Sequence, residues 1–312
     1  MPLEKIDVGN VVAPPKICVV ICTFNRPALL TKLLIALEPQ VLQRSCHTII
    51  LDSGAISAAG SVEPFLRHTN IHYYQAKVSG LSAARNQSLK LALALEADFI
   101  AFIDDDEWPS SCWLAGMMSV AESSGADVVA GPVHPLYENA APWWVLEQGF
   151  FAKPADVLST ANLFLRSSRL PKNEDDWFHH SFGFSGGEDE EFLSRLVKAG
   201  RSCAIAPNAI VYEHVPIIRM TARYLWWRGF RDGAIAAKLI RHQNNSVIAI
   251  LYKLARVTTA KFFYGLNHII WSPIAPSRFY CGLADFSAVL GIVSTLLGLK
   301  FAFYGQNNYS EN

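Results

Sequence analysis

The chain has 312 residues, of which 51% are hydrophobic and only 17% are charged. The 27 basic side chains balance 27 acidic ones, so the sequence lacks the basic excess that is typical of a nucleic-acid-binding protein. Mean hydropathy is positive at +0.20, and the charged fraction lies below the roughly 25% of ordinary soluble domains. We therefore expect one large α/β domain with an apolar appendage and no nucleic-acid partner.

The spacing of the cysteines and the composition of the N-terminal residues bear on the cellular compartment. The six cysteines are scattered and form no CxxC pair, which favours a reducing compartment over a disulfide framework. Met1–Lys16 contains two acids, two lysines and three prolines but no apolar h-region, so we expect a loose leader at residues 1–15 and no signal peptide.

Short apolar runs alternate with amphipathic stretches from residue 16 onward. The expected strands are Ile17–Cys22, Thr48–Leu51, Ile71–Tyr74, Phe99–Ile103 and Asp127–Gly131. One expected helix begins at Pro27. Three others cover Ser82–Leu95, Trp113–Ser123 and Glu190–Ala199. This βαβαβ rhythm predicts a doubly wound, mostly parallel sheet.

The rhythm breaks after Gly131. Pro132–Lys172 is rich in proline and tryptophan and is expected to form loops and irregular pieces over the sheet, before a short strand at Cys203–Ala206. Arg219–Arg231 then interleaves arginines with aromatic residues, and three apolar-rich segments follow: Ser246–Ala260, Phe262–Trp271 and Leu283–Tyr304. We divide the chain into a leader (1–15), a catalytic domain (16–218) and a helical C-terminal region (219–312).

Four acids, Asp104–Glu107, come directly after the apolar strand Phe99–Ile103. In an open α/β sheet, ligands bind outside the carboxyl ends of the strands. Four carboxylates at that edge repel one another unless a cation neutralises them, and a hard divalent cation with a diphosphate would complete such a site. The alternative is a solvated acidic turn that caps the next helix.

A second acidic cluster, Glu188–Glu191, follows the glycine pair Gly186–Gly187. The glycines let the backbone approach a ligand closely, and one carboxylate could serve as a general base. Alternatively, these acids complement the dipole at a helix N-terminus. Both interpretations hold if Glu190 and Glu191 serve the helix while Asp189 points to the site.

Five segments in this order resemble the family 2 glycosyltransferases of the GT-A fold. They are Val19–Pro27, Leu51–Gly54, Gly80–Asn86, Phe102–Glu107 and Gly187–Asp189. Gly131–Val133 followed by Pro142–Trp143 also resembles the subgroup that contains the succinoglycan β-1,4-glucosyltransferase. The resemblance extends from about Lys16 to His214.

The resemblance implies a role for individual residues. The nucleotide base would lie beside Thr23, Phe24, Asn25 and Arg26, and the uracil or ribose would be held by Asp52. The diphosphate would lie near Arg85 and Asn86. The donor would also be contacted by Asp104 and Asp105. Asp104 and Asp106 match the DXD motif, with Asp106 as the direct ligand of Mn²⁺ or Mg²⁺ and His214 as a late ligand. Asp189, next to Glu188, matches the catalytic base.

Three of these residues have a structural alternative. Asp52 could be an ordinary turn residue, Arg85 an ordinary surface arginine, and a lone histidine such as His214 is more often structural.

The implied function is an inverting, metal-dependent transfer of one sugar from a UDP-hexose, UDP-glucose in particular, to a lipid-linked oligosaccharide in surface or exopolysaccharide synthesis. Arg223–Gly229 matches the QxxRW motif of processive synthases only loosely, so we expect single-sugar transfer. Two alternatives remain open: a sugar nucleotidyltransferase, although no glycine follows the first strand at Thr23–Pro27, and a catalytically silent membrane-associated scaffold.

The apolar excess of the C-terminal region suggests a membrane surface. A membrane-spanning helix needs about 20 mostly apolar residues. Phe286–Leu299 is too short and is bounded by Asp285 and Lys300. We expect peripheral attachment to the cytoplasmic face of the membrane, with Arg219–Arg231 at the headgroups. The alternative is a helical subdomain packed on the core or in a homodimer.

Overall fold

The computed structural model describes residues 14–44, 46–76, 80–244 and 246–299. Most of the predicted leader, residues 1–13, and the end of the last apolar segment, residues 300–304, lie outside the described residues.

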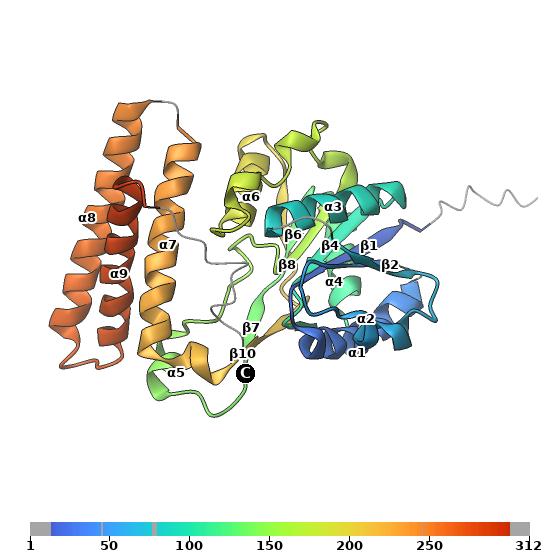
Figure 1. Ribbon diagram of the computed structural model, residues 1–312, viewed down its shortest axis with the longest axis horizontal. Coiled ribbons are helices and arrows are strands. Elements are labelled where there is room, and N and C mark those ends of the chain that lie inside the picture. The colour runs from blue at the N-terminus through green and yellow to red at the C-terminus, as the bar shows by residue number, and fades with distance from the viewer. Residues whose placement is uncertain (1–13, 45, 77–79, 245, 300–312) are drawn as a thin grey trace, which may run out of the picture.

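A seven-stranded sheet with the order β3-β2-β1-β4-β8-β6-β9 forms the centre of the molecule (Figure 1). Its strands are β1 (Ile17–Thr23), β2 (His47–Asp52), β3 (Ile71–Gln75), β4 (Phe99–Ile103), β6 (Val128–Ala130), β8 (Asn162–Arg166) and β9 (Cys203–Ile205). Neighbouring strands are parallel except at β8, which runs antiparallel to β4 and β6. The predicted doubly wound, mostly parallel sheet is confirmed.

Helices cover both faces of this sheet. They are α1 (Pro27–Arg44), α2 (Ala59–Val62), α3 (Leu81–Ala94), α4 (Trp113–Ser124) and α6 (Glu188–Lys198). Alternate residues of each strand belong to two separate apolar clusters: Val19 packs with α1 and α4, whereas Val20 packs with α3 and α6. Since both faces of the central strands β1 and β4 are buried, these strands are apolar along nearly their whole length, which explains why they are visible in the sequence.

The structure corrects our expectation for Pro132–Lys172. This stretch contains β7 (Val133–Tyr137), the short helix α5 (Trp143–Gln148) and the fully internal strand β8. The amide of Asn162 fastens β8 in place: it accepts from Trp113 Nε1 at 2.8 Å and donates to the carbonyls of Pro132 and Ala209 at 3.0 and 2.8 Å.

A smaller sheet lies against the carboxyl end of β4. Its order is β5-β10-β7, with β5 at Glu107–Pro109 and β10 at Val211–Val215. Because β5 begins immediately after the three aspartates, this sheet brings β10 and the turn η5 (Ile217–Met220) beside the acidic cluster.

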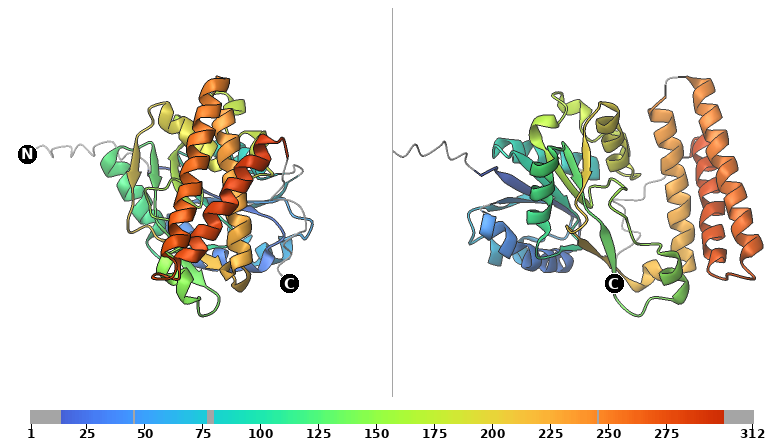
Figure 2. Two further views of the ribbon diagram at one scale, coloured as in Figure 1. Left: turned by 90° about the vertical axis from the view of Figure 1, so that its left-hand side faces the viewer. Right: turned by 180° about the vertical axis from the view of Figure 1, so that it is seen from behind.

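Three long helices form the C-terminal region: α7 (Ala222–His242), α8 (Val247–Trp271) and α9 (Arg278–Leu296). The first two predicted apolar segments are thus one continuous helix, α8. Helix α7 lies between the sheet and the α8–α9 pair (Figures 1 and 2). Of the helices that the structure describes, α9 is long and apolar enough by composition to cross a membrane.

Candidate active site

The three aspartates after β4 meet the end of β1 at one edge of the sheet. The Thr23 hydroxyl donates to Asp105 Oδ2 at 2.8 Å. The Arg26 guanidinium lies 3.1 Å from both Asp105 and Asp106. Parallel strands end at the same edge, so residues about 80 positions apart in sequence share one polar cluster.

A second guanidinium reaches the same cluster from η5. Arg219 contacts Asp106 Oδ2 at 3.2 Å and Glu213 Oε1 at 3.1 Å, with 16% of its side chain exposed. Glu213 in turn contacts Lys153 at 3.0 Å. We predicted Arg219 as part of a stretch at the membrane headgroups, and the structure corrects this: its side chain belongs to the acidic cluster.

The pKa values of the neighbouring carboxyls Asp105 and Asp106 shift in opposite directions. Burial raises the pKa of Asp105 to about 7, although Arg26 and the Thr23 hydroxyl oppose that shift. Burial alone would also raise the pKa of Asp106, but Arg26 and Arg219 together hold its pKa below the usual value. Asp106 is therefore the ionised carboxylate at the centre of the cluster.

A buried ion pair connects the two acidic clusters that the sequence predicted. The side chains of Arg85, near the start of α3, and Glu188, the first residue of α6, are both 5% exposed and in direct contact. Arg85 also lies 3.4 Å from Asp104, whose side chain is 41% exposed. Arg85 is thus no ordinary surface arginine; it positions the start of α6 against the end of β4.

Asp189 lies at the first turn of α6, at the edge of this arrangement. Its Oδ2 accepts a hydrogen bond from the Ser159 hydroxyl at 3.1 Å, and its Oδ1 accepts from the backbone of Glu190 at 2.8 Å. Gly187, with φ of +83°, supplies the sharp entry into the helix, and a Cβ there would lie 2.4 Å from Ile235 Cγ2 of α7. The glycine pair therefore lets α7 pack directly beside the candidate base.

Two predicted donor-binding residues are engaged by the chain itself. Asp52 is fully buried and accepts from the backbones of Gly54 and Ala58 and from the Tyr73 hydroxyl. The Asn86 amide donates to and accepts from the backbone of Phe178, at 2.9 Å in each case. In this structure Asp52 shapes the turn after β2, and Asn86 anchors the chain before η4 (His180–Phe182).

The remaining predicted residues lie near the cluster without joining it. Phe24 is 41% exposed, and Asn25, at φ of +56°, accepts from the Ile56 backbone. The backbone N–H of His214 donates to the Asp106 carbonyl at 2.8 Å, but its ring packs edge-on against Trp108, with centroids 5.8 Å apart. The structure brings His214 beside Asp106 through the backbone, and its role as a late metal ligand stays a prediction.

Within the described part of the chain, no three His, Cys, Asp or Glu side chains are grouped to hold a metal ion. The donors that are present, Asp104 and Asp106, are carboxylates, which suit a hard divalent cation. Mg²⁺ is usually held by only one or two protein carboxylates, with substrate phosphates and water as its other ligands. The residues therefore fit a cation that arrives together with a diphosphate, and Arg26 and Arg219 balance the charge of Asp106 meanwhile.

Besides Arg219, sequence reasoning missed four residues of this site. Glu107 is 1% exposed and accepts from the Asp104 backbone, and its pKa is raised well above the usual value by burial and by Asp104. Glu213, Lys153 and Ser159 complete the set. Glu107 was within a quoted motif and Glu213 adjoins His214, but no local pattern marks Lys153 or Ser159.

Comparison with known proteins decides the family. The sequence profile "Glycosyl transferase family 2" matches residues 18–187. The succinoglycan biosynthesis protein ExoM of Rhizobium meliloti is 32% identical over 90% of this chain and 92% of its own length. The chain belongs to glycosyl transferase family 2. A hyaluronan synthase of Pasteurella multocida is 30% identical over 64% of this chain but only 24% of its own length.

Solved structures support the fold of this glycosyltransferase. The mannosyltransferase PcManGT from Pyrobaculum calidifontis, in complex with GDP-Man and Mn²⁺, superposes with a TM-score of 0.60 at 13% identity and covers 92% of this chain and 88% of its own. S. aureus TarS in complex with UDP has a TM-score of 0.52 at 16% identity and covers 94% of both chains. The predicted GT-A fold with a helical C-terminal extension is confirmed.

Proposed function

We propose that this family member is an inverting, metal-dependent glycosyltransferase that moves a single hexose from a UDP-hexose, UDP-glucose in particular. The observation that carries the proposal is the position of the Asp106 carboxylate between Arg26 and Arg219 at the carboxyl end of β4. Two guanidiniums beside a carboxylate can bind the two phosphates of a donor, while the carboxylate binds their cation. The neighbours solved with GDP-Man and Mn²⁺, and with UDP, support a nucleotide donor.

In this proposal each charged group has one task. Asp106 and Asp104 would hold Mn²⁺ or Mg²⁺, and the ion would supply positive charge to stabilise the departing diphosphate. Arg26 and Arg219 move from Asp106 to the phosphate oxygens, and Arg85 stays with Glu188 and fixes the start of α6. Asp189 acts as the general base and takes the proton of an acceptor hydroxyl that lies within hydrogen-bond reach. Direct displacement at the anomeric carbon then inverts its configuration.

For the acceptor we propose a lipid-linked oligosaccharide of a surface or extracellular polysaccharide. The similarity to a succinoglycan biosynthesis protein along nearly the whole chain supports a polysaccharide product. The C-terminal helices support a lipid-linked substrate. Helix α8 exposes a row of large apolar side chains, among them Val247, Ile248, Leu251 and Phe263, which are 58–81% exposed.

The same row supports peripheral attachment to a membrane. Helix α8 has no acidic residue and carries the exposed Lys253 and Arg256, so its charge suits an anionic lipid surface. Helix α9 packs against both α7 and α8 through small residues, including Gly229 and Gly282. Since α9 is enclosed on those sides by its neighbours, we propose attachment along α8 at the cytoplasmic face and not a spanning α9.

The direct test is a screen of UDP-, GDP- and dTDP-sugars with Mn²⁺ or Mg²⁺, measuring binding and nucleotide release. The anomeric configuration of the product, determined by proton NMR, tests inversion. UDP-glucose-dependent UDP release with an inverted product supports the proposal. Release of pyrophosphate would support the nucleotidyltransferase alternative, and no turnover with any donor, acceptor or metal would support the silent scaffold.

A further inference from the structure

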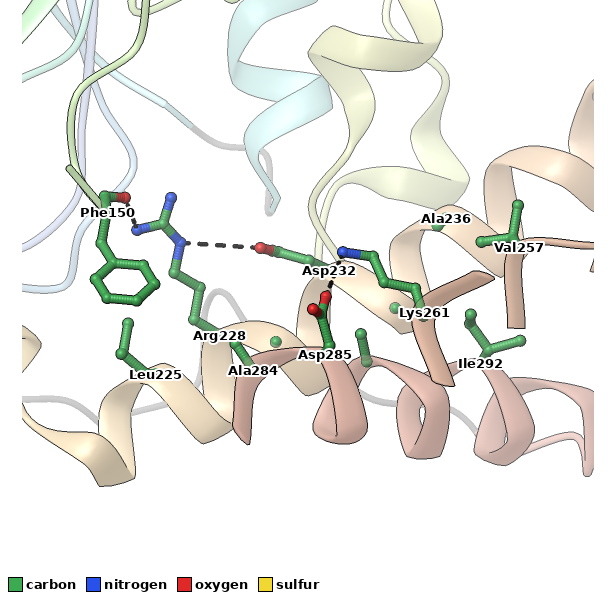
Figure 3. A pocket seen from close by; sticks show the side chains of 13 residues that line it. Phe150, Leu225, Arg228, Asp232, Ala236, Val257, Lys261, Ala284, Asp285 and Ile292 are labelled. Atoms are coloured by element: carbon green, nitrogen blue, oxygen red, sulfur yellow. Dashed lines mark hydrogen bonds and ion pairs between the residues drawn. The ribbon is translucent and has the colours of Figure 1, made fainter. Parts of the chain in front are cut away.

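A cavity of about 250 Å³ lies between the three C-terminal helices and the catalytic part (Figure 3). Its walls come from α7, with Arg228 and Asp232, and from α8, with Lys261. Its floor comes from α9, with Asp285 and Ala288. Phe150, which follows α5, closes the end nearest the sheet. Helix α9 presents small residues, among them Ala284 and Ala288, where it lines the cavity beside α7.

The polar groups of this cavity occur as opposite pairs. Arg228 donates to the carbonyl of Phe150 at 2.8 Å and lies 3.8 Å from Asp232 Oδ2. Lys261 lies 2.7 Å from Asp285 Oδ1, and His268 lies 3.8 Å from the other oxygen of Asp285. Because each cation has a carboxylate beside it, an anion such as a phosphate meets as much repulsion as attraction here.

Paired donors and acceptors instead match a ligand whose groups both donate and accept. Sugar hydroxyls are such groups, and each can accept from Arg228 or Lys261 and donate to Asp232 or Asp285. The side chains of Phe150 and Leu225 lie on one side of Arg228 and offer an apolar surface to the C–H face of a ring (Figure 3). The volume is below the roughly 300–1,000 Å³ of pockets for drug-sized ligands, so it suits one sugar ring.

The cavity is also close to the candidate base. Ile235 of α7 touches Gly187, two residues before Asp189, and Asp232 lies one helical turn before Ile235. Burial raises the pKa of Glu190, and the nearby charges of Asp189 and Asp232 raise that pKa further. The contact of Ile235 and the charge of Asp232 therefore connect the Asp232 side of the cavity with the first turn of α6, where the candidate base lies.

We propose that this cavity is the acceptor subsite and binds one neutral sugar residue of the acceptor glycan through Arg228, Asp232 and Phe150. The inference rests on the proposed function and adds to it the place and chemistry of acceptor recognition. It also explains how the helical region serves the catalytic part: α8 meets the membrane on its outer side, and α7 presents the acceptor sugar to Asp189 on the other.

The test measures binding of p-nitrophenyl hexopyranosides to the full-length protein by saturation-transfer NMR, without donor or metal. The variants are Arg228→Met and Asp232→Asn, and the matched control is Arg223→Met, an exposed arginine on the same helix outside the cavity. Circular dichroism and UDP binding establish that each variant is folded. We expect saturable binding of at least one glycoside at millimolar concentration.

We expect each cavity variant to raise the dissociation constant about tenfold, because one charge-assisted hydrogen bond corresponds to about that factor. Arg223→Met should leave the constant within about twofold. No saturable binding by any glycoside, or equal loss in the control, would overturn the subsite. Displacement of the glycoside by farnesyl diphosphate in the parent protein but not in Arg228→Met would also overturn the subsite, since the cavity would then recognise a lipid diphosphate. Donor turnover is measured separately, so a failed subsite and a failed transferase are distinguishable.

Discussion

At the scale of single residues, the three aspartates after β4 have three different environments. Asp104 is half exposed beside Arg85, Asp105 is buried against Thr23, and Asp106 lies between two guanidiniums. Only Asp106 combines burial with a pKa below the usual value, so it can bind a cation without first losing a proton. The environment, more than the motif, thus distinguishes the three.

Asp106→Asn should therefore abolish most of the transfer activity. The amide has no negative charge for the cation, and Arg26 and Arg219 lose their shared partner. We expect donor turnover to fall by several orders of magnitude, with an equal loss when excess EDTA is added to the parent enzyme. Near-normal turnover of a folded Asp106→Asn protein, or full activity in EDTA, would contradict this assignment.

Asp189→Asn and Glu188→Gln should separate chemistry from positioning. Asp189→Asn removes the proposed base, so transfer should cease while UDP-sugar binding, measured by calorimetry, stays nearly intact. Glu188→Gln breaks the charge pairing with buried Arg85 and should chiefly lower stability, by about 2–4 kcal/mol in urea unfolding, while leaving more activity. An inactive Glu188→Gln beside an active Asp189→Asn would reverse the two roles.

Asp105 should make stability depend on pH. Its pKa is about 7 in the folded protein and about 4 in an unfolded chain, so the folded state holds the proton more tightly. Its contribution to stability is therefore largest below pH 4 and is lost as the pH rises through 7. In EDTA, Asp105→Asn should gain up to about 4 kcal/mol relative to the parent between pH 4 and 8. Urea unfolding at several pH values measures this gain, and a difference independent of pH would refute it.

At the scale of elements, helix α9 packs against α7 through backbone-to-backbone contact. A Cβ at Gly291 would lie 2.0 Å from the carbonyl oxygen of Phe230, and one at Gly233 would lie 2.0 Å from that of Ala288. No side chain can yield at such a contact, so the helices themselves would have to separate. This close packing fixes the position of α7 and hence of its contact with α6.

Gly291→Ala should consequently destabilise the helical region. We expect the free energy of unfolding to fall by about 1–3 kcal/mol, which is the usual effect of overpacking. The thermal unfolding midpoint should fall accordingly. Gly60→Ala in α2 is the matched control, because nothing lies within 4 Å of its Cβ position. The control should be neutral or gain about 0.4–1 kcal/mol. Equal behaviour of the two variants would show that the α7–α9 contact is loose.

At the scale of the whole molecule, helix α8, which carries the exposed apolar row, lies on the side of the C-terminal region away from the sheet (Figures 1 and 2). Burial of that row in lipid would remove several largely exposed apolar side chains from water, each worth up to about 1.5–3 kcal/mol. Part of the excess hydrophobicity of the chain is thus gathered on the exposed face of α8.

Replacing two residues of this row by acids should release the protein from membranes. The double variant Ile248→Glu, Leu251→Glu should no longer float with phosphatidylglycerol vesicles, and deletion of residues 246–312 should have the same effect. Ile35→Glu on α1, which is 61% exposed, is the matched control and should still bind. A parent protein that stays soluble and monomeric without detergent or lipid would refute attachment. Release of the parent by salt alone would assign attachment to basic side chains.

The sequence by itself determined the βαβ rhythm and the two acidic clusters. Strands buried on both faces are uniformly apolar, and acids that directly follow such a strand must lie at its carboxyl end, so local patterns sufficed. Only the tertiary structure decided the insertion of β8, the use of Asn86 and Asp52 by their own chain, and the pairing of Arg219 with Asp106. That pair is 113 residues apart in sequence. Which cation meets which carboxylate depends on distances of a few ångströms across the fold, and no sequence period encodes them.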